Sequence, residues 1–226
     1  MDTPRKCLKK KSVMRVPCIL IACAVLAGCA SAKPQLRGPT EAERAQIDQA
    51  LGPLVAASAM CQGHDRCPIG VGVIQLRRID LAVGSLPPNL FGLTITAGAL
   101  KSLQPSELQA ALAHELGHVQ LGHIDTRAER RQAEGPAAAK ASAGGEEALR
   151  RNRAYDREEE FAADRYAVEL LDKLPGGPGR GCTDMLLLLE LLDLEMTVPA
   201  WSSWLSTHPT PAARLQAIQK VCGKTP

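Results

Sequence analysis

The sequence predicts an α+β fold that is mainly α-helical, with a small β-sheet in its first half. Segments with apolar residues at helical spacing occupy most of the chain. Typical helix-start residues precede several of these segments. One stretch, residues 69–96, is instead rich in β-branched residues and is interrupted by two prolines. Together these observations predict helices on both sides of a few short strands.

The first predicted helix opens at Thr40. Glu43 follows three residues later, which is the spacing of a capping box, in which each side chain bonds the backbone N–H of the other residue. Apolar residues then recur at helical spacing, at Ile47, Leu51, Leu54 and Val55. We expect this helix to end before Cys61, and we expect residues 29–39, which precede it, to be a flexible tether.

Short strands are predicted after this helix. The β-branched run from Ile69 to Val83 indicates one or two strands, and Phe91–Thr96 indicates another. Pro87 and Pro88 stand between them and cannot donate hydrogen bonds to a strand ladder, so we expect a turn there.

Helices are predicted again in the second half of the chain. Residues 126–150 are charged or small and lack a steady apolar period, which predicts a mobile loop. A helix is expected over Asn152–Leu174, and a largely buried, leucine-rich helix over Asp184–Met196. Thr210 followed by Pro211 is typical of the start of a last helix.

The chemistry is indicated by His114-Glu115-Leu116-Gly117-His118, in a helix expected to start near Pro105. Residues four apart share a helix face, so both imidazoles can reach one metal ion with Glu115 beside them. Zinc suits such nitrogen ligands, and a catalytic zinc keeps one position open. The motif therefore predicts attack of water on a carbonyl, with Glu115 as general base.

Two histidines leave a zinc ion without its third protein ligand. Candidates are His123, His208 and a glutamate within Arg157–Asp164. His123 follows His118 by five residues, which does not match the metzincin spacing, and a polar role near the helix end is the simpler interpretation. The residues alone leave the other two candidates open.

The N-terminus is typical of an export signal. Residues 1–15 carry six basic residues and one acidic residue, and the uncharged run Val16–Ala27 is short for a membrane-spanning helix. Leu26-Ala27-Gly28-Cys29 resembles a bacterial lipobox, which implies removal of residues 1–28 and lipidation of Cys29. An ordinary signal or an N-terminal membrane anchor is the alternative. Ala30 does not resemble an inner-membrane retention signal, which favours the outer membrane.

Removal of this segment changes the charge of the protein. The full chain has 27 basic and 24 acidic residues, and removal of residues 1–28 leaves 21 and 23, a net charge of −2. The basic character thus belongs largely to the signal, and no nucleic-acid partner is expected. The remaining chain suffices for one hydrophobic core, so we expect a single domain over residues 40–226.

Four cysteines remain beyond Cys29, and an even number in an oxidising compartment favours two disulfides. We expect Cys61–Cys67 to close a short loop and Cys182–Cys222 to hold the C-terminal end. Because no C-x-x-C pair occurs, a structural metal site is disfavoured. Free thiols are the other alternative.

Three motifs together resemble the HtpX-like zinc metallopeptidases of peptidase family M48, a gluzincin group. These motifs are His114–His118, Glu160-Phe161-Ala162-Ala163-Asp164 and Ser206-Thr207-His208-Pro209, and the resemblance spans about Leu90 to Leu215. It implies a zincin-like domain with a small antiparallel β-sheet packed on the active-site helix. It also implies that Leu93–Leu100 is the edge strand that receives an extended substrate.

The same resemblance implies roles for individual residues. Glu160 would be the third ligand of one Zn²⁺ per chain, and Asp164 would accept a hydrogen bond from a ligand histidine. His208, with Arg214 after it, matches the late His-Pro element of the family. His208 would lie near the metal, where it either stabilises the oxyanion or occupies the open metal position; both roles stay open.

The sequence thus predicts a zinc-dependent endopeptidase held by its lipid anchor at the periplasmic face of the envelope, in the outer membrane. Misfolded or damaged envelope proteins, bound in extended form, are the expected substrates. The alternative is a non-proteolytic or latent lipoprotein, stabilised by zinc, that acts as a chaperone in envelope assembly. The oligomeric state is left open.

Overall fold

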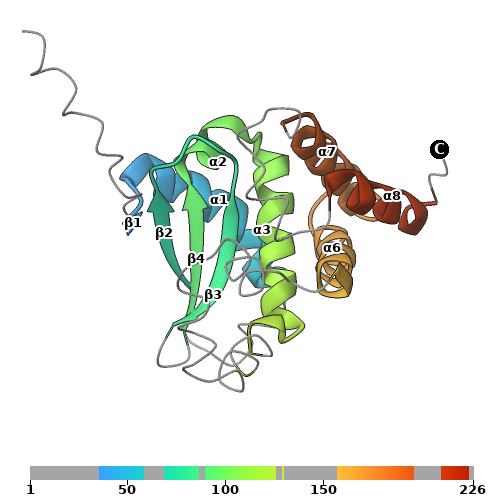
Figure 1. The fold of residues 1–226 in the computed structure, drawn as a ribbon, viewed down its shortest axis with the longest axis horizontal. Helices are drawn as coiled ribbons and strands as arrows, with labels where there is room; N and C mark the ends of the chain where they lie inside the picture. The colour runs from blue at the N-terminus through green and yellow to red at the C-terminus, as the bar shows by residue number, and fades with distance from the viewer. Residues whose placement is uncertain are drawn as a thin grey trace, which may run out of the picture. The chain divides into compact units, whose positions relative to one another are not determined.

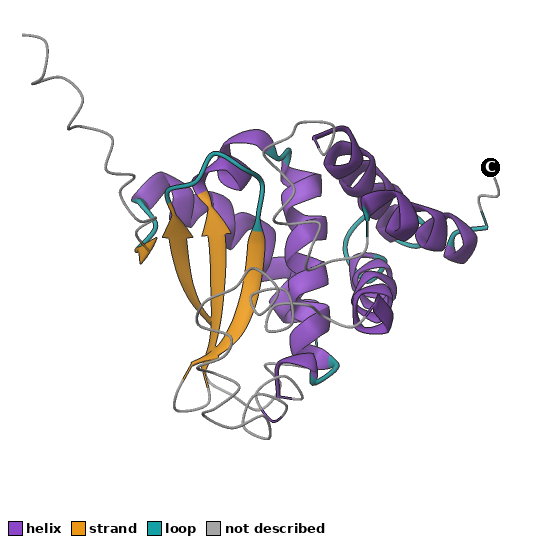
Figure 2. Ribbon diagram, viewed as in Figure 1, coloured by secondary structure: helices purple, strands orange, loops and turns teal. Residues whose placement is uncertain are grey.

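Helix α3 (Pro105–Gln120) lies between a four-stranded sheet and a group of later helices (Figure 1). These are α6 (Arg157–Leu171), α7 (Arg180–Glu195) and α8 (Pro211–Val221). The computed structural model describes residues 36–58, 69–86, 90–125, 129, 157–195 and 210–223. Figure 2 shows that helix dominates this part of the chain, which confirms the predicted mainly helical α+β fold.

The sheet is mixed rather than antiparallel. Its strands are β1 (Leu36–Arg37), β2 (Ile69–Ile74), β3 (Leu81–Leu86) and β4 (Leu90–Thr96), in the order β1-β2-β4-β3. The outer pairs are antiparallel, but β2 and β4 run parallel. The expectation of an antiparallel sheet is therefore wrong for its central pair. The short connection makes β3 and β4 neighbours, but it does not decide which of them pairs with β2.

Strand β4 is a central strand, contrary to the expectation that Leu93–Leu100 would form a substrate-binding edge. It pairs with β2 on one side and with β3 on the other, so its hydrogen-bonding groups are used within the sheet. The edge nearest α3 is β3 (Figure 1). An extended peptide that adds to the sheet beside α3 must therefore pair with β3.

The expected strand also ends earlier than predicted, because Ala97–Ser102 forms helix α2. Oγ1 of Thr96 accepts a hydrogen bond from the Ala99 N–H (3.2 Å) and thereby caps this helix. Gly98 allows the close approach of a neighbouring loop, since a Cβ there would lie 2.0 Å from the Arg77 carbonyl oxygen. This six-residue helix was not expected from the sequence, because its residues continue an apolar run.

Helix α1 (Glu41–Ala57) begins after Thr40, and its capping box is present as predicted. Oε2 of Glu43 accepts from the Thr40 N–H (2.7 Å), and the Glu43 N–H donates to Oγ1 of Thr40 (3.3 Å). Arg37 donates two hydrogen bonds to the same Glu43 carboxylate, at 2.6 and 2.7 Å. Leu36 and Arg37, expected to belong to the tether, instead form β1 against β2.

Helix α7 starts at Arg180, four residues before the expected Asp184. Gly181, which resembles a loop residue in the sequence, is needed inside this helix, because a Cβ there would lie 2.1 Å from the Val168 carbonyl oxygen. The glycine therefore lets α7 pack closely against α6 without ending the helix. The sequence shows a glycine but not this contact.

A disulfide between Cys182 and Cys222, with a Cα–Cα distance of 5.8 Å, joins α7 to the end of α8, as predicted. Thr210 caps α8 by accepting from the Ala213 N–H (3.3 Å), and Pro211 is its first residue, also as predicted. The leucine-rich face of α7 is buried in the main hydrophobic core, with Met185, Leu188 and Leu189.

Among the residues that the structure describes, no helix combines the length and the hydropathy needed to cross a bilayer. Several predictions concern residues outside the described ranges: Cys29, the Cys61–Cys67 disulfide, the Pro87-Pro88 turn, nearly all of residues 126–150, and His208.

Candidate metal and active site

Helix α3 carries the histidine motif into the interior. Pro105 occupies its first turn, where no N–H partner is required, and Oε2 of Glu107 accepts from the Gln104 N–H (2.7 Å). The helix is buried from Leu108 to Val119. His114, Glu115 and His118 are 5%, 6% and 0% exposed, so the polar motif lies in a largely dry environment.

Helix α6 packs closely on α3 at Gly117, inside the motif. A Cβ at Gly117 would lie 3.0 Å from both Cα and the carbonyl oxygen of Ala163, so the absence of a side chain lets the helices approach. Glu160 stands nearly one turn before Ala163 and is fully buried. The close crossing thereby brings a carboxylate of α6 to the two imidazoles of α3.

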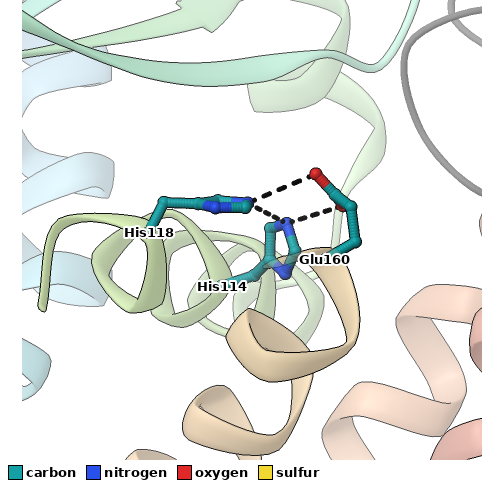
Figure 3. A group of neighbouring side chains, drawn as sticks. All are labelled: His114, His118 and Glu160. Atoms are coloured by element: carbon teal, nitrogen blue, oxygen red, sulfur yellow. Dashed lines mark hydrogen bonds and ion pairs between the residues drawn. The ribbon is translucent and has the colours of Figure 1, made fainter. Parts of the chain in front are cut away.

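His114, His118 and Glu160 form the metal-binding group, and their side chains point toward one another (Figure 3). The Nε2 atoms of the two histidines lie 3.1 Å apart, and each lies 3.4 Å from an oxygen of Glu160. Within the described ranges this is the one cluster of three or more His, Cys, Asp or Glu side chains suited to a metal ion.

These distances fit three ligands of one ion. Bonds of about 2.0–2.1 Å to a tetrahedral zinc separate neighbouring donor atoms by about 3.3 Å. The observed separations are 3.1 and 3.4 Å. Two imidazoles and one carboxylate also form a known catalytic zinc set, which leaves a fourth position open. The residues present therefore fit a catalytic zinc site.

Asp164, one turn after Glu160 on α6, contacts the first histidine. Its Oδ1 lies 2.8 Å from Nδ1 of His114, and the side chain is buried. For Nε2 of His114 to hold a metal ion, its lone pair must be free, so the remaining ring proton then lies on Nδ1 and is donated to Asp164. The structure thus has the hydrogen bond that the family resemblance implied for Asp164.

Arg214 of α8 belongs to the site, although its match to the late His-Pro element had implied no role for it. Its guanidinium is 3% exposed and donates to both oxygens of Asp164, from Nε (2.8 Å) and Nη2 (2.5 Å). Its Nη1 lies 3.5 Å from Oε2 of Glu160. The sequence did contain a signal for its burial, which is the helical spacing of Arg214 from Pro211 and Ile218. These three are the buried residues of α8. An arginine in that spacing occupies the apolar face of its helix.

The charges of this group shift the protonation of its members. Burial and Arg214 lower the pKa of His114, but Asp164 and Glu160 raise it more, and it reaches about 9. Burial raises the pKa of Asp164, but Arg214 outweighs this effect and the pKa falls to about 2. Asp164 is therefore a carboxylate that orients His114 across the physiological pH range.

His118 has a different neighbour. Its Nδ1 lies 3.0 Å from Nδ1 of His123, which is half-buried just beyond the end of α3. With Nε2 of His118 directed at the metal-binding group, Nδ1 carries the proton and donates it to His123. Burial lowers the pKa of His118 to about 3. His123 thus contacts the ring nitrogen opposite the metal-binding group, in line with the prediction that it is not the third ligand.

The structure therefore brings together five of the predicted site residues: His114, Glu115, His118, Glu160 and Asp164. Glu115 is buried beside His114, and its negative charge contributes to raising the pKa of Arg214. Cys29, Cys61, Cys67 and His208 lie outside the described residues.

Comparison with known proteins gives two findings. The sequence profile of peptidase family M48 matches residues 84–222, more than half of the chain and all of the site described above. The crystal structure of S. mikatae Ste24p is similar, with a TM-score of 0.50 and 17% identity over 82% of this chain and 51% of that one. This chain thus spans about half the length of Ste24p, and the likeness shows the fold alone. No curated protein matches the sequence.

Proposed function

Because the chain belongs to peptidase family M48, a family of metallopeptidases, we propose that it is a zinc-dependent endopeptidase. The observation that carries the proposal is the buried group of His114, His118 and Glu160, whose donor atoms have the separations of zinc ligands. One Zn²⁺ per chain is expected. Mixed imidazole and carboxylate donors favour zinc over magnesium or calcium, which prefer oxygen ligands.

Glu115 is the proposed general base. Zinc bound at this site supplies Lewis-acid polarisation of the peptide carbonyl and activation of water at neutral pH. Glu115 follows His114 directly on α3 and is 6% exposed, so its carboxylate lies where bulk water competes little. It would take a proton from the attacking water and later deliver a proton to the leaving amine.

Asp164 and Arg214 would orient the site rather than react. Asp164 fixes the tautomer of His114, and the paired guanidinium of Arg214 keeps Asp164 ionised. His208 remains our candidate for an accessory residue. It would either donate a hydrogen bond to the developing oxyanion or cover the open metal position.

The edge strand β3 is the proposed substrate-binding strand. The Thr96 N–H donates to the Asp80 carbonyl (3.0 Å), just before β3 begins. In an antiparallel pair, every second residue of a strand directs its N–H and C=O toward the partner strand. Counting from Asp80, the residues between, Leu81, Val83 and Ser85, therefore direct their backbone groups to the side of β3 away from β4. An extended peptide can pair there as an added strand, next to α3.

Cellular location is a further part of the proposal. Lipidation of Cys29 would hold the domain at the periplasmic face of the outer membrane, since buried acyl CH₂ groups each contribute about 0.8 kcal/mol. Substrates would then be misfolded or damaged envelope proteins. Comparing the envelope proteomes of wild-type and Glu115→Gln strains tests this, and proteins that accumulate at full length in the variant are the expected substrates.

The test of the reaction is the Glu115→Gln variant, which should retain zinc but lose hydrolysis of casein by at least about 100-fold, as expected for loss of a general base. Glu107→Gln on the same helix is the control, because it changes a capping carboxylate away from the metal group. Wild-type rates in Glu115→Gln would contradict the mechanism. A zinc-loaded wild type that cleaves nothing would favour the chaperone alternative.

A further inference from the structure

A partly enclosed cavity of about 520 Å³ lies where α1, the start of α3 and the first residue of α7 meet. Its volume falls within the range of pockets that bind small ligands, about 300–1,000 Å³. Most of the lining residues are polar: Gln46, Gln49, Gln104, Ser106, Gln109 and Arg180. Ala50, Pro105 and Leu108 complete the lining. The cavity therefore suits a polar ligand that also has a small apolar part.

The cavity is separate from the metal-binding group. Ser106 stands eight residues before His114 on α3, a distance of about 12 Å along the helix axis. The helices that contact the metal-binding residues of α3 are α6 and α8, whereas the cavity is formed with α1 and α7. A ligand in the cavity would therefore contact none of the metal-binding residues.

The guanidinium of Arg180 is held in a fixed position at the cavity. Its Nε donates to Oδ2 of Asp184 (3.0 Å), Nη1 donates to the Pro175 carbonyl (2.7 Å), and Nη2 donates to Oε1 of Gln109. Gln109 is 7% exposed and is fixed in turn, because its Nε2 donates to the Ala50 carbonyl (2.9 Å). These bonds use three of the five N–H groups of the guanidinium. One N–H on each of Nη1 and Nη2 is left without a partner among the described residues.

The two remaining N–H groups suit a carboxylate. Two N–H groups of one guanidinium can bind both oxygens of a carboxylate, a geometry that a lysine cannot offer. Among the described lining residues, Arg180 is the one charged side chain. Asp184, which pairs with Nε of the same guanidinium, is 7% exposed and does not line the cavity. An anionic group can thus approach the free N–H groups without meeting a carboxylate in this lining.

The glutamines of the cavity suit a peptide backbone. Each glutamine amide carries both a donor and an acceptor, as each peptide unit does. Gln46 uses Nε2 in a bond to the Leu100 carbonyl (2.9 Å), which leaves its Oε1 to accept from a ligand. Gln49 and Gln104 are exposed residues of the lining. The cavity therefore offers donors and acceptors for peptide units next to a cation for a carboxylate.

We propose that the cavity binds the C-terminal end of a peptide chain, with the carboxylate on Arg180 and the last peptide units on the glutamine amides. The basis is the pair of unused N–H groups on a fixed guanidinium, the uncharged remainder of the lining, and the size of the cavity. The inference goes beyond the proposed function, because binding here requires neither the metal nor cleavage. Such a site would hold the free end of a peptide about two turns of α3 away from the metal-binding group.

The test compares the binding of trialanine and of its C-terminal amide to the full chain after any zinc has been removed with a chelator. The two peptides differ only in the carboxylate, and hydrogen bonds to a charged group are stronger than those to a neutral one. We expect trialanine to bind at least about 10-fold more tightly than its amide. A titration followed through the NMR signals of the peptide gives both dissociation constants. Inorganic phosphate serves as a competing anion without peptide groups.

Two variants locate the binding at the cavity. Gln49→Glu places a like charge near the carboxylate and should weaken trialanine binding about 5-fold or more, with the amide unaffected. Gln216→Glu is the matched control, since it makes the same change at an exposed position of α8 outside the cavity. Arg180→Lys keeps a cation for Asp184 but loses the planar pair of N–H groups, so the preference for trialanine over its amide should fall at least about 5-fold.

Three results would overturn the proposal: no binding of trialanine, equal binding of trialanine and its amide, or a loss in Gln49→Glu no larger than in Gln216→Glu. Displacement of trialanine by an equal concentration of phosphate would show recognition of charge alone and would also overturn it. A thermal melt identifies unfolding, and if Arg180→Lys does not fold, the exposed Gln49→Glu decides. Failure of the proposed function appears separately, as absence of casein hydrolysis by the zinc-loaded protein.

Discussion

The two histidines of the motif lie one turn apart on α3, but their surroundings differ. His114 contacts Asp164, 50 residues later in the chain, whose partner Arg214 lies a further 50 residues on. His118 contacts His123, only five residues away. Nδ1 of the first ring therefore contacts charged residues of two other helices, whereas Nδ1 of the second contacts another imidazole just beyond its own helix.

The pKa values follow this difference. Carboxylates raise the pKa of His114 to about 9, whereas burial lowers that of His118 to about 3. One motif thus combines two kinds of contact at Nδ1. Charges from distant parts of the chain link His114 to the folding of α6 and α8, whereas the Nδ1 contact of His118 is with a residue five positions away. Variants that remove one support at a time should therefore have unequal effects.

Arg214→Leu should have the largest effect, on the stability of the fold. It leaves the carboxylate of Asp164 buried without its cation, and breaking a buried pair in this way costs about 3–5 kcal/mol. Arg37→Leu is the control, because Arg37 also forms two hydrogen bonds to one carboxylate but is 32% exposed. We expect a much smaller loss for this pair, because solvent screens its charges.

Urea denaturation in the presence of a chelator measures both free energies of unfolding, so that metal binding contributes to neither. Equal losses for Arg214→Leu and Arg37→Leu would contradict the view that buried charge supports the His114 side. Asp164→Leu combined with Arg214→Leu should recover part of the loss, since no charge is then left unpaired.

Asp164→Asn should have the next largest effect, on metal affinity. Asparagine keeps the shape of the side chain but removes the charge that orients His114, and loss of such outer partners lowers metal affinity about 10- to 100-fold. Competition with a chromogenic chelator measures the change. Asp172→Asn is the control on the same stretch of chain, because among the described residues Asp172 accepts from the backbone N–H groups of Gly179 and Gly181, away from the metal-binding group. A similar loss in both variants would show a general effect of removing a carboxylate from this segment rather than a specific effect on His114.

Local signals explain which elements were predictable from the sequence. Thr40 and Thr210 mark helix starts through hydrogen bonds made within one turn, and Pro105 does so through its fixed backbone angle. All three helices begin there. Strand order is decided by contacts between distant segments, so the parallel pairing of β2 and β4 left no local signal. Likewise, Gly98 shows its function only when the neighbouring loop is in place.

The site follows the same division. His114, Glu115 and His118 are readable because their spacing lies within a single helix. Glu160 could be assigned only by resemblance to a family, since its position depends on the close crossing of α3 and α6 at Gly117. Arg214 was recognised as part of a family element but had no assigned role, because its burial results from three helices packing together. Its place on the apolar face of α8 was the available signal.

His123→Ala should have the smallest effect of the three and tests the local side of the comparison. A typical hydrogen bond contributes about 0.5–1.5 kcal/mol, which corresponds to a loss of metal affinity of about 2- to 12-fold. Bonds to a charged partner are roughly twice as strong, so this loss should stay below that of Asp164→Asn. His123 is also half-buried, and water that enters its place can accept the Nδ1 proton of His118.

Competition with the chromogenic chelator again measures the metal affinity. His123→Asn keeps a hydrogen-bond acceptor and is the control, so its affinity should lie between those of the wild type and His123→Ala. A loss in His123→Ala as large as that of Asp164→Asn would mean that the two histidines depend equally on their partners, and that the long-range charges give His114 no special support.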